Sequence, residues 1–211
     1  MDNITIINKY DIKSILKEFS KYDDCIIFGK GPTLTYFNKD NYKNTLFICI
    51  NESINYIKKC DLLVCNDYET SNHIDIQYYN ECKYILIPYH PHYQARPHEN
   101  ITYKNIVSKI KSHFTGKIII YNLSTYPKIY HNFISLISQT TSVHTAFEFI
   151  TKYVKHIKLI NFYGFAKDKQ NREINVYKNK KDENAHKTRI NDYIHCIKIL
   201  NSDRQINYVI N

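Results

Sequence analysis

The chain has 211 residues, a formal net charge of +9 at pH 7 and 43% hydrophobic residues, and its length is typical of one domain. Its 20 Tyr and 10 Phe argue against intrinsic disorder, and its 4 Gly and 5 Pro exclude a collagen-like or linker-rich chain. No apolar run approaches the roughly 20 residues of a membrane span, and the first residues lack the layout of a signal peptide. We therefore expect a soluble cytoplasmic protein whose six cysteines are reduced thiols of the core.

Short apolar runs alternate along the chain with segments that have helical spacing. The predicted strands are residues 25–28, 46–50, 62–65, 84–87, 118–121, 157–160 and 208–210, and the predicted helices are 11–19, 53–57, 101–110, 143–154 and 187–200. Apolar runs of four or five residues are typical of parallel strands buried on both faces. The alternation predicts an α/β fold, a Rossmann-like and mostly parallel sheet flanked by helices, with residues 1–211 forming a single domain.

Two segments interrupt this alternation. Residues 88–100 contain three prolines and three histidines, which predicts a rigid irregular loop. Residues 166–185 are polar and basic, which predicts a small polar lid. Residues 151–192 carry 11 Lys or Arg against 5 Asp or Glu, an excess of +6 that favours either an anionic partner or a solvated face.

A glycine-containing turn follows the first predicted strand and consists of Gly29, Lys30, Gly31, Pro32 and Thr33. Glycine at the end of a strand lets backbone N–H groups approach a phosphate closely. The turn matches neither the P-loop nor the dinucleotide-binding pattern. It is therefore interpreted either as an anion-binding turn or as a plain tight turn.

Polar residues also stand where the next predicted strands end, namely Asn51 and Asn66. The amide of Asn offers a donor and an acceptor, which suits a nucleobase edge or a ribose hydroxyl, although each Asn alone is as well explained as a helix cap. Three hydroxyl residues precede the helix at 143–154, whose N-terminus favours an anion, and these are Thr140, Thr141 and Ser142. Because ligands bind beyond the carboxyl ends of parallel strands, these residues predict a nucleotide site.

His186 opens the last predicted helix and is the candidate general base. A neutral imidazole can take a proton from a hydroxyl near pH 7, and the alternative is an ordinary surface histidine. His90, His92 and His98 do not have a recognised ligand spacing, so no metal site is predicted.

The ordered set of motifs resembles the bacterial sialyltransferases of glycosyltransferase family 42. That family has a G-N-G-P-S-L turn, an Asn after each of the next two strands, S-S-G-V opening a helix, a strand that runs into D-F-Y, and a D-x-x-H segment. The matching residues here are Gly29-Lys30-Gly31-Pro32-Thr33-Leu34, Asn51, Asn66, Thr140-Thr141-Ser142-Val143, Asn161-Phe162-Tyr163, and Asp182 to His186.

The resemblance implies a metal-independent transfer of a sugar from a nucleotide donor, CMP-linked in the family, to the hydroxyl of a glycan or other acceptor, with no separate cofactor. It implies that His186 is the general base and that Tyr163 and Tyr177 hydrogen-bond the departing phosphate. The donor nucleotide and sugar would be held by Asn51, Asn66, Thr140, Thr141 and Ser142.

Three departures from the family are Lys30 for Asn, Ser142 for Gly and Asn161 for Asp. With these departures we still expect the chain to bind a nucleotide sugar, but the resemblance no longer fixes that sugar as sialic acid. The G-x-G-P-[ST]-L turn also resembles that of a related group of pterin-pyrophosphokinase-like proteins, which implies an alternative enzyme that uses Mg²⁺ and ATP, with Asp67 and Glu69 near the metal. A second alternative is a non-catalytic nucleotide or nucleic-acid binding module that uses the basic lid, and a second copy of the chain is a further candidate partner.

Overall fold

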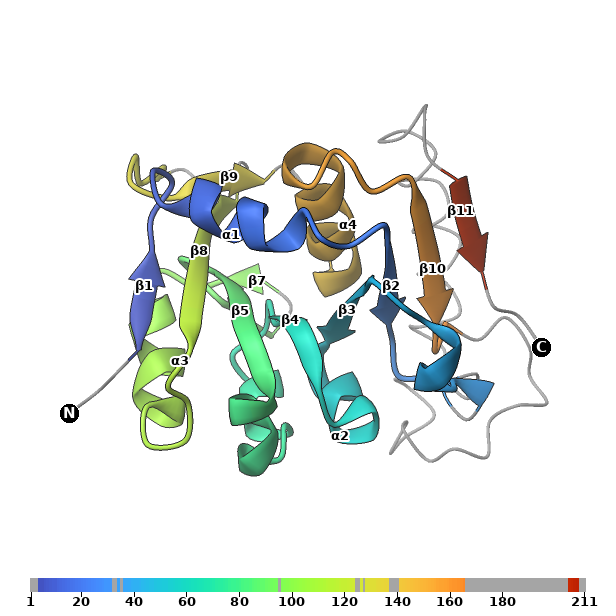
Figure 1. The fold of residues 1–211 in the computed structure, drawn as a ribbon. Helices are drawn as coiled ribbons and strands as arrows, with labels where there is room; N and C mark the ends of the chain where they lie inside the picture. Colours follow the sequence, from blue (N-terminus) through green and yellow to red (C-terminus); the bar gives the residue numbers. More distant parts are fainter. Residues whose placement is uncertain are drawn as a thin grey trace.

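The computed structural model describes residues 4–31, 34, 36–94, 96–123, 126, 128–136, 141–165 and 205–208. Helices flank a mostly parallel sheet (Figure 1), which confirms the predicted α/β class. The strands are β1 (Thr5–Ile7), β2 (Asp24–Phe28), β3 (Thr45–Ile50), β4 (Cys60–Val64), β5 (Cys82–Pro88), β6 (His92–Tyr93), β7 (Arg96–Pro97), β8 (Lys117–Leu123), β9 (Ile134–Leu136), β10 (Leu159–Tyr163) and β11 (Gln205–Tyr208). The α-helices are α1 (Ile12–Phe19), α2 (Ile54–Ile57), α3 (Tyr103–Ile110) and α4 (Ser142–Tyr153).

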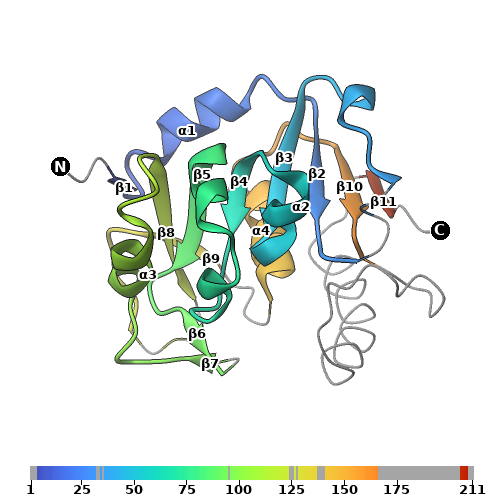
Figure 2. The same ribbon diagram turned by 90° about the horizontal axis from the view of Figure 1, so that it is seen from below.

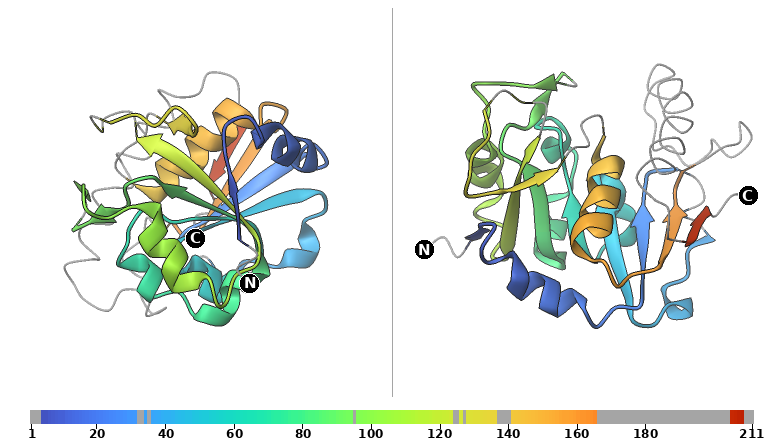
Figure 3. Two further views of the ribbon diagram at one scale, coloured as in Figure 1. Left: turned by 90° about the vertical axis from the view of Figure 1, so that its left-hand side faces the viewer. Right: turned by 90° about the horizontal axis from the view of Figure 1, so that it is seen from above.

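The strand order of the main sheet is β1-β8-β5-β4-β3-β2-β10-β11, with β9 paired to β8, and every pair in it is parallel. The chain moves outward from β2 through β3, β4, β5 and β8, and then returns to place β10 on the other side of β2. Helices α1 and α4 cover one face of the sheet, and α2 and α3 cover the other (Figure 3). The reversal between β2 and β10 is a topological switch point, where open parallel sheets bind their ligands.

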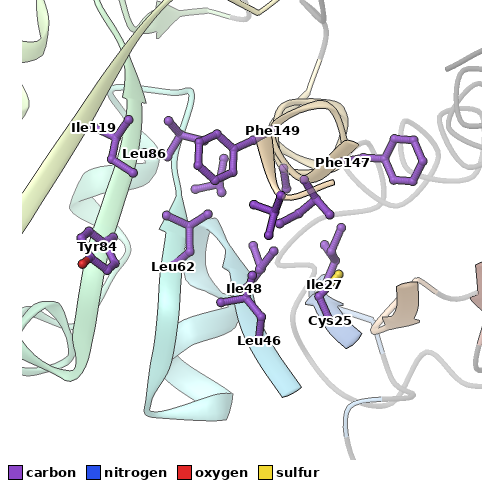
Figure 4. Close-up of a cluster of buried hydrophobic side chains, with 14 of the residues drawn as sticks. Cys25, Ile27, Leu46, Ile48, Leu62, Tyr84, Leu86, Ile119, Phe147 and Phe149 are labelled. Carbon is purple, nitrogen blue, oxygen red and sulfur yellow. The ribbon is translucent and has the colours of Figure 1, made fainter. Parts of the chain in front are cut away.

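Alternate residues of the central strands face two separate apolar layers. All six residues of β3 are buried, as expected of a parallel strand covered on both sides. One layer packs against α1 and α4, where Phe149 lies beside Leu86 and Phe147 lies on the side of Ile27 (Figure 4). The other layer packs against α2 and α3 and contains Phe28 and Ile106. Helices α1, α2, α3 and α4 lie where helical spacing predicted them.

The strand predictions were shifted at the C-terminal side of the sheet. Strand β10 was predicted at 157–160, but it pairs with β2 over Leu159–Tyr163. The prediction was wrong there because Ile157 is buried in the turn that follows α4, and burial alone does not make a strand. Strand β11 begins three residues before the predicted 208–210 and pairs with β10. Strands β1 and β9 were not predicted, and the loop 88–100 contains the β6–β7 hairpin.

Five cysteines are described, and all five are buried, which confirms their assignment to the core. Across the described ranges, no helix is both long enough and apolar enough to cross a membrane. The predicted helix 187–200 and the predicted lid 166–185 lie outside the described residues.

Candidate functional site

The turns after β2 and β10 meet at the switch point. The Gly29 N–H donates to the Tyr163 carbonyl at 2.7 Å, and the Gly31 N–H donates to the Gly164 carbonyl at 2.6 Å. A Cβ on Gly29 would lie 2.6 Å from the Gly164 carbonyl oxygen, and Gly164 has a φ of +77°, so both positions require glycine. These glycines let two backbones approach each other, and the two amide groups are therefore engaged within the protein.

Lys30 places a cation beside this contact. Its Nζ lies 2.9 Å from Oε2 of Glu52, which follows β3, and Oε1 of Glu52 lies 3.3 Å from Nδ1 of His73. The Lys30 side chain is 21% exposed and that of Glu52 is 17% exposed, so the pair is only partly screened by solvent. Burial tends to raise the pKa of Glu52, but the charge and hydrogen bond of Lys30 outweigh it and hold that pKa below the usual value.

A hydrogen-bonded chain joins the ends of β3 and β4 to the start of α4. The Ser142 hydroxyl donates to Oδ1 of Asn51 at 3.1 Å and accepts the backbone N–H of Asn66 at 3.2 Å. Asn51 has a φ of 53°, a left-handed conformation that Asn adopts more readily than most residues. Thr141 caps α4, since its hydroxyl oxygen accepts the N–H of His144 at 3.5 Å. The structure therefore brings Asn51, Asn66 and Ser142 together.

The Asn66 side chain is completely buried and is used within the protein. Its amide nitrogen donates to Oγ1 of Thr145 at 2.9 Å, and its Oδ1 accepts the Tyr121 hydroxyl at 2.7 Å. The amide nitrogen of Asn51, by contrast, has no hydrogen-bond partner among the described residues. Asn66 therefore organises the edge of the sheet, whereas Asn51 has an amide donor that no described residue uses.

Tyr163 lies apart from these residues. Its side chain is 7% exposed and its hydroxyl shares a hydrogen bond with the Tyr42 hydroxyl. Its ring centroid lies 6.2 Å from that of Phe28 and 5.5 Å from that of Phe37, within the layer that α2 and α3 cover. The Asn66 side chain instead contacts α4 through Thr145. The structure does not bring the Tyr163 hydroxyl to the two asparagines.

Five predicted site residues and the lid fall on parts of the chain that are not described. They are Pro32, Thr33, Thr140, Tyr177 and His186. The roles expected of them stay predictions from the sequence.

His92 is a site residue that sequence reasoning considered only as a metal ligand. It is 2% exposed, and its backbone N–H donates to the Asn66 carbonyl at 2.7 Å. The Nδ1 of its imidazole lies 3.7 Å from Oδ1 of Asp67. Burial lowers the pKa of His92, so its imidazole is neutral at pH 7. The sequence feature that could have identified His92 is its position shortly after β5, because that strand ends at the same edge of the sheet as β4. No group of three or more His, Cys, Asp or Glu arranged to hold a metal ion is present in the described part of the chain.

Replacing Lys30 with Gln tests the ion pair through the pH dependence of stability. A lowered folded-state pKa means that Glu52 stabilises the fold above its unfolded pKa of about 4.3, and that this contribution is lost as the pH falls through the folded value. We expect Lys30→Gln to reduce the free energy of unfolding by about 1–3 kcal/mol at pH 7. The difference from the unchanged protein should shrink as the pH falls below the unfolded pKa of Glu52, and it should vanish below the lowered folded-state pKa, where Glu52 is protonated in both proteins.

Urea unfolding between pH 3 and pH 8 measures this difference. The matched control is Lys117→Gln, which breaks the more exposed pair of Lys117 and Glu18, whose charged atoms are 3.5 Å apart. We expect the control to change the free energy of unfolding by less than about 1 kcal/mol. A Lys30→Gln effect that is equal at pH 3 and pH 7 would contradict the assignment to the charge of Glu52.

The described site thus consists of a cation, an asparagine amide and a buried imidazole at the carboxyl edge of a parallel sheet. These side chains could together bind a ligand in which an uncharged polar group lies next to an anionic group. No protein-family model matches the chain, no curated protein matches it, and no solved structure matches it.

Proposed function

We propose that the chain is a glycosyltransferase that takes a sugar from a nucleotide donor, with a CMP-linked sugar as the first candidate, and passes it to a hydroxyl acceptor. The observation that supports this most is the placement of Lys30 and Asn51 together at the carboxyl edge, next to the switch point of a parallel sheet. The reaction class comes from the resemblance of the ordered motifs to glycosyltransferase family 42.

Donor binding is assigned to Asn51 and Lys30. Ser142 holds the carbonyl oxygen of the Asn51 side chain, so the amide nitrogen is the group that can donate to a base or a phosphate oxygen. The ammonium of Lys30 already pairs with Glu52, so in this proposal the donor phosphate shares that ammonium with the carboxylate, and partial burial strengthens both interactions.

The leaving group is a nucleotide phosphate, which gains negative charge as its bond to the anomeric carbon breaks. Lys30 stabilises that charge. The Tyr163 hydroxyl is engaged with Tyr42 on the other layer, so we give it no part in this step. Tyr177 stays a candidate on the sequence alone.

The acceptor hydroxyl must lose its proton as its oxygen bonds to the anomeric carbon. In this proposal His186 takes the proton, and the nucleotide leaves with the electron pair of the broken bond. His92 is the second imidazole to test, because it is neutral at pH 7 and lies beside Asp67 at the same edge.

Binding measured by titration calorimetry tests the donor site. The probes are CMP, CMP-linked sialic acid, UDP-glucose, and ATP with Mg²⁺. Asn51→Asp tolerates the left-handed backbone but replaces the donor with an anionic oxygen, and we expect it to weaken binding of the CMP compounds about tenfold or more. The matched control is Asn100→Asp, which makes the same change at an exposed asparagine that belongs to neither the candidate site nor the pocket described below.

The probes also separate the alternatives. Binding of ATP with Mg²⁺ that Asn51→Asp weakens, together with no binding of any CMP compound, would replace this proposal with the pyrophosphokinase-like enzyme. Binding of RNA or DNA alone, with a steep dependence on salt, would favour the non-catalytic module. Equal effects of Asn51→Asp and Asn100→Asp would show that the donor does not bind where we place it.

A further inference from the structure

A pocket lies at the amino edge of the sheet, opposite the candidate site. Its volume is about 410 Å³, and its lining includes residues at the starts of β3, β4 and β5. The 3₁₀-helix Lys39–Asn41 contributes to this edge, and in Figure 2 it lies at the other end of the sheet from the β6–β7 hairpin. A pocket of this size falls within the range of small-molecule sites. The candidate site at the carboxyl edge uses none of its residues.

Four lysines line this pocket, and they are Lys21, Lys39, Lys59 and Lys83. Among the described residues of the lining, Asp61 is the only acidic one, so these residues carry a net charge of +3. Asp61 is 8% exposed and already neutralised, because Lys83 pairs with it, the Tyr22 hydroxyl donates to it at 2.5 Å and the Phe47 N–H donates to it at 3.0 Å. Three of the cations therefore have no salt bridge to a carboxylate in the described part of the chain.

Aromatic rings form the apolar part of the lining. The Nζ of Lys21 lies 5.0 Å from the ring centroid of Tyr22, and that of Lys39 lies 5.8 Å from the ring centroid of Phe47. These contacts place cations over ring faces at the pocket. Burial and the neighbouring Asp61 raise the pKa of Tyr22 to about 12, so this hydroxyl stays protonated and adds no negative charge.

We propose that this amino-edge pocket binds a small molecule that carries two or three linked phosphates. Three unpaired ammonium groups around one concave site match the charge of an oligophosphate, and lysine binds phosphate as a point charge. Tyr42 and Phe47 offer ring surface to an apolar portion of the ligand, so a nucleoside polyphosphate fits better than an inorganic chain. The proposal does not depend on the glycosyltransferase assignment, because it uses other residues at the other edge.

Titration calorimetry with inorganic tripolyphosphate, ATP and AMP tests the pocket. The variant is Lys21→Gln/Lys39→Gln/Lys59→Gln, which keeps Lys83 so that Asp61 stays paired. The matched control is Lys13→Gln/Lys111→Gln/Lys128→Gln, which removes the same charge from three exposed lysines outside the pocket lining. We expect the pocket variant to weaken binding of tripolyphosphate and ATP at least about tenfold, and the control less than about threefold.

Three results would overturn the proposal. Equal weakening by the two triple variants would show that the lysines act only through net charge. Binding of AMP as tight as that of ATP would contradict the need for linked phosphates. Loss of tripolyphosphate binding in Lys30→Gln, with normal binding in the pocket variant, would show that the anion binds at the carboxyl edge instead. That last result would leave the proposed donor site standing.

Discussion

Replacing His186 with alanine is expected to lower turnover of a CMP-linked donor about 10²–10⁴-fold, the usual contribution of a general base. Donor binding should be unchanged, because the base acts on the acceptor hydroxyl and not on the nucleotide. Rates of CMP release in the presence of acceptor, combined with calorimetric titration of the donor, separate the two effects. The expectation rests on the place of His186 in the ordered motifs.

Two further histidine variants make this result decisive. His195→Ala is the matched control, since His195 lies nine positions further along the same predicted helix and has no expected role. His92→Ala tests the buried imidazole beside Asp67. If His186→Ala keeps full turnover and His92→Ala loses it, the base belongs to the loop after β5. If neither variant loses turnover, the general-base mechanism is wrong.

Replacing Asn66 with alanine is expected to lower the free energy of unfolding by about 2–4 kcal/mol, up to roughly a thousandfold in the folding equilibrium. The change removes the acceptor of the buried Tyr121 hydroxyl and the donor to Thr145, and it also leaves a small cavity. Burial and the charges of nearby acids raise the pKa of Tyr121, so the stranded hydroxyl cannot ionise near neutral pH. Urea unfolding monitored by circular dichroism measures the loss.

A double-mutant cycle with Tyr121→Phe identifies the cause of that loss. In the Asn66→Ala background, Tyr121→Phe removes a hydroxyl that has already lost its main acceptor, so it should cost at least about 1 kcal/mol less than in the unchanged protein. The exposed Asn100→Ala is the matched control, with an expected effect within about 0.5 kcal/mol. Additive effects of Asn66→Ala and Tyr121→Phe would contradict the proposed network.

The class of fold was predictable from local patterns. Runs such as 46–50 are apolar at every position, and this is what burial on both faces of a parallel strand demands, so β3 lies where it was expected. The grouping of Asn51 with Asn66 was predictable as well, because parallel strands end at one edge of the sheet. The amphipathic spacing of 11–19 marked α1, which buries one side against the sheet. Helical spacing also marked α4, although its residues from Ser142 to Ile150 are all buried.

The internal partners of these residues were not predictable. The sequence offers no sign that Tyr121 and Thr145 consume both polar atoms of Asn66, because those contacts join a strand, a loop and a helix that are distant along the chain. Tyr163 was expected beyond the end of a strand, yet it is the last residue of β10. Side chains alternate along a strand, so its place in the strand commits the ring to the layer that α2 and α3 cover.

By itself the sequence determined the parallel α/β architecture and the edge at which polar residues collect, because hydrophobic periodicity and strand direction are local properties of the chain. Only the tertiary structure decided which of those polar side chains are hydrogen-bonded to other described residues. It decided as well that the N–H groups of Gly29 and Gly31 are bonded to the carbonyls of Tyr163 and Gly164. It also decided that four lysines scattered from 21 to 83 share one pocket. Hydrogen bonding and charge neutralisation depend on distances in space, and sequence spacing does not encode those distances between separate elements.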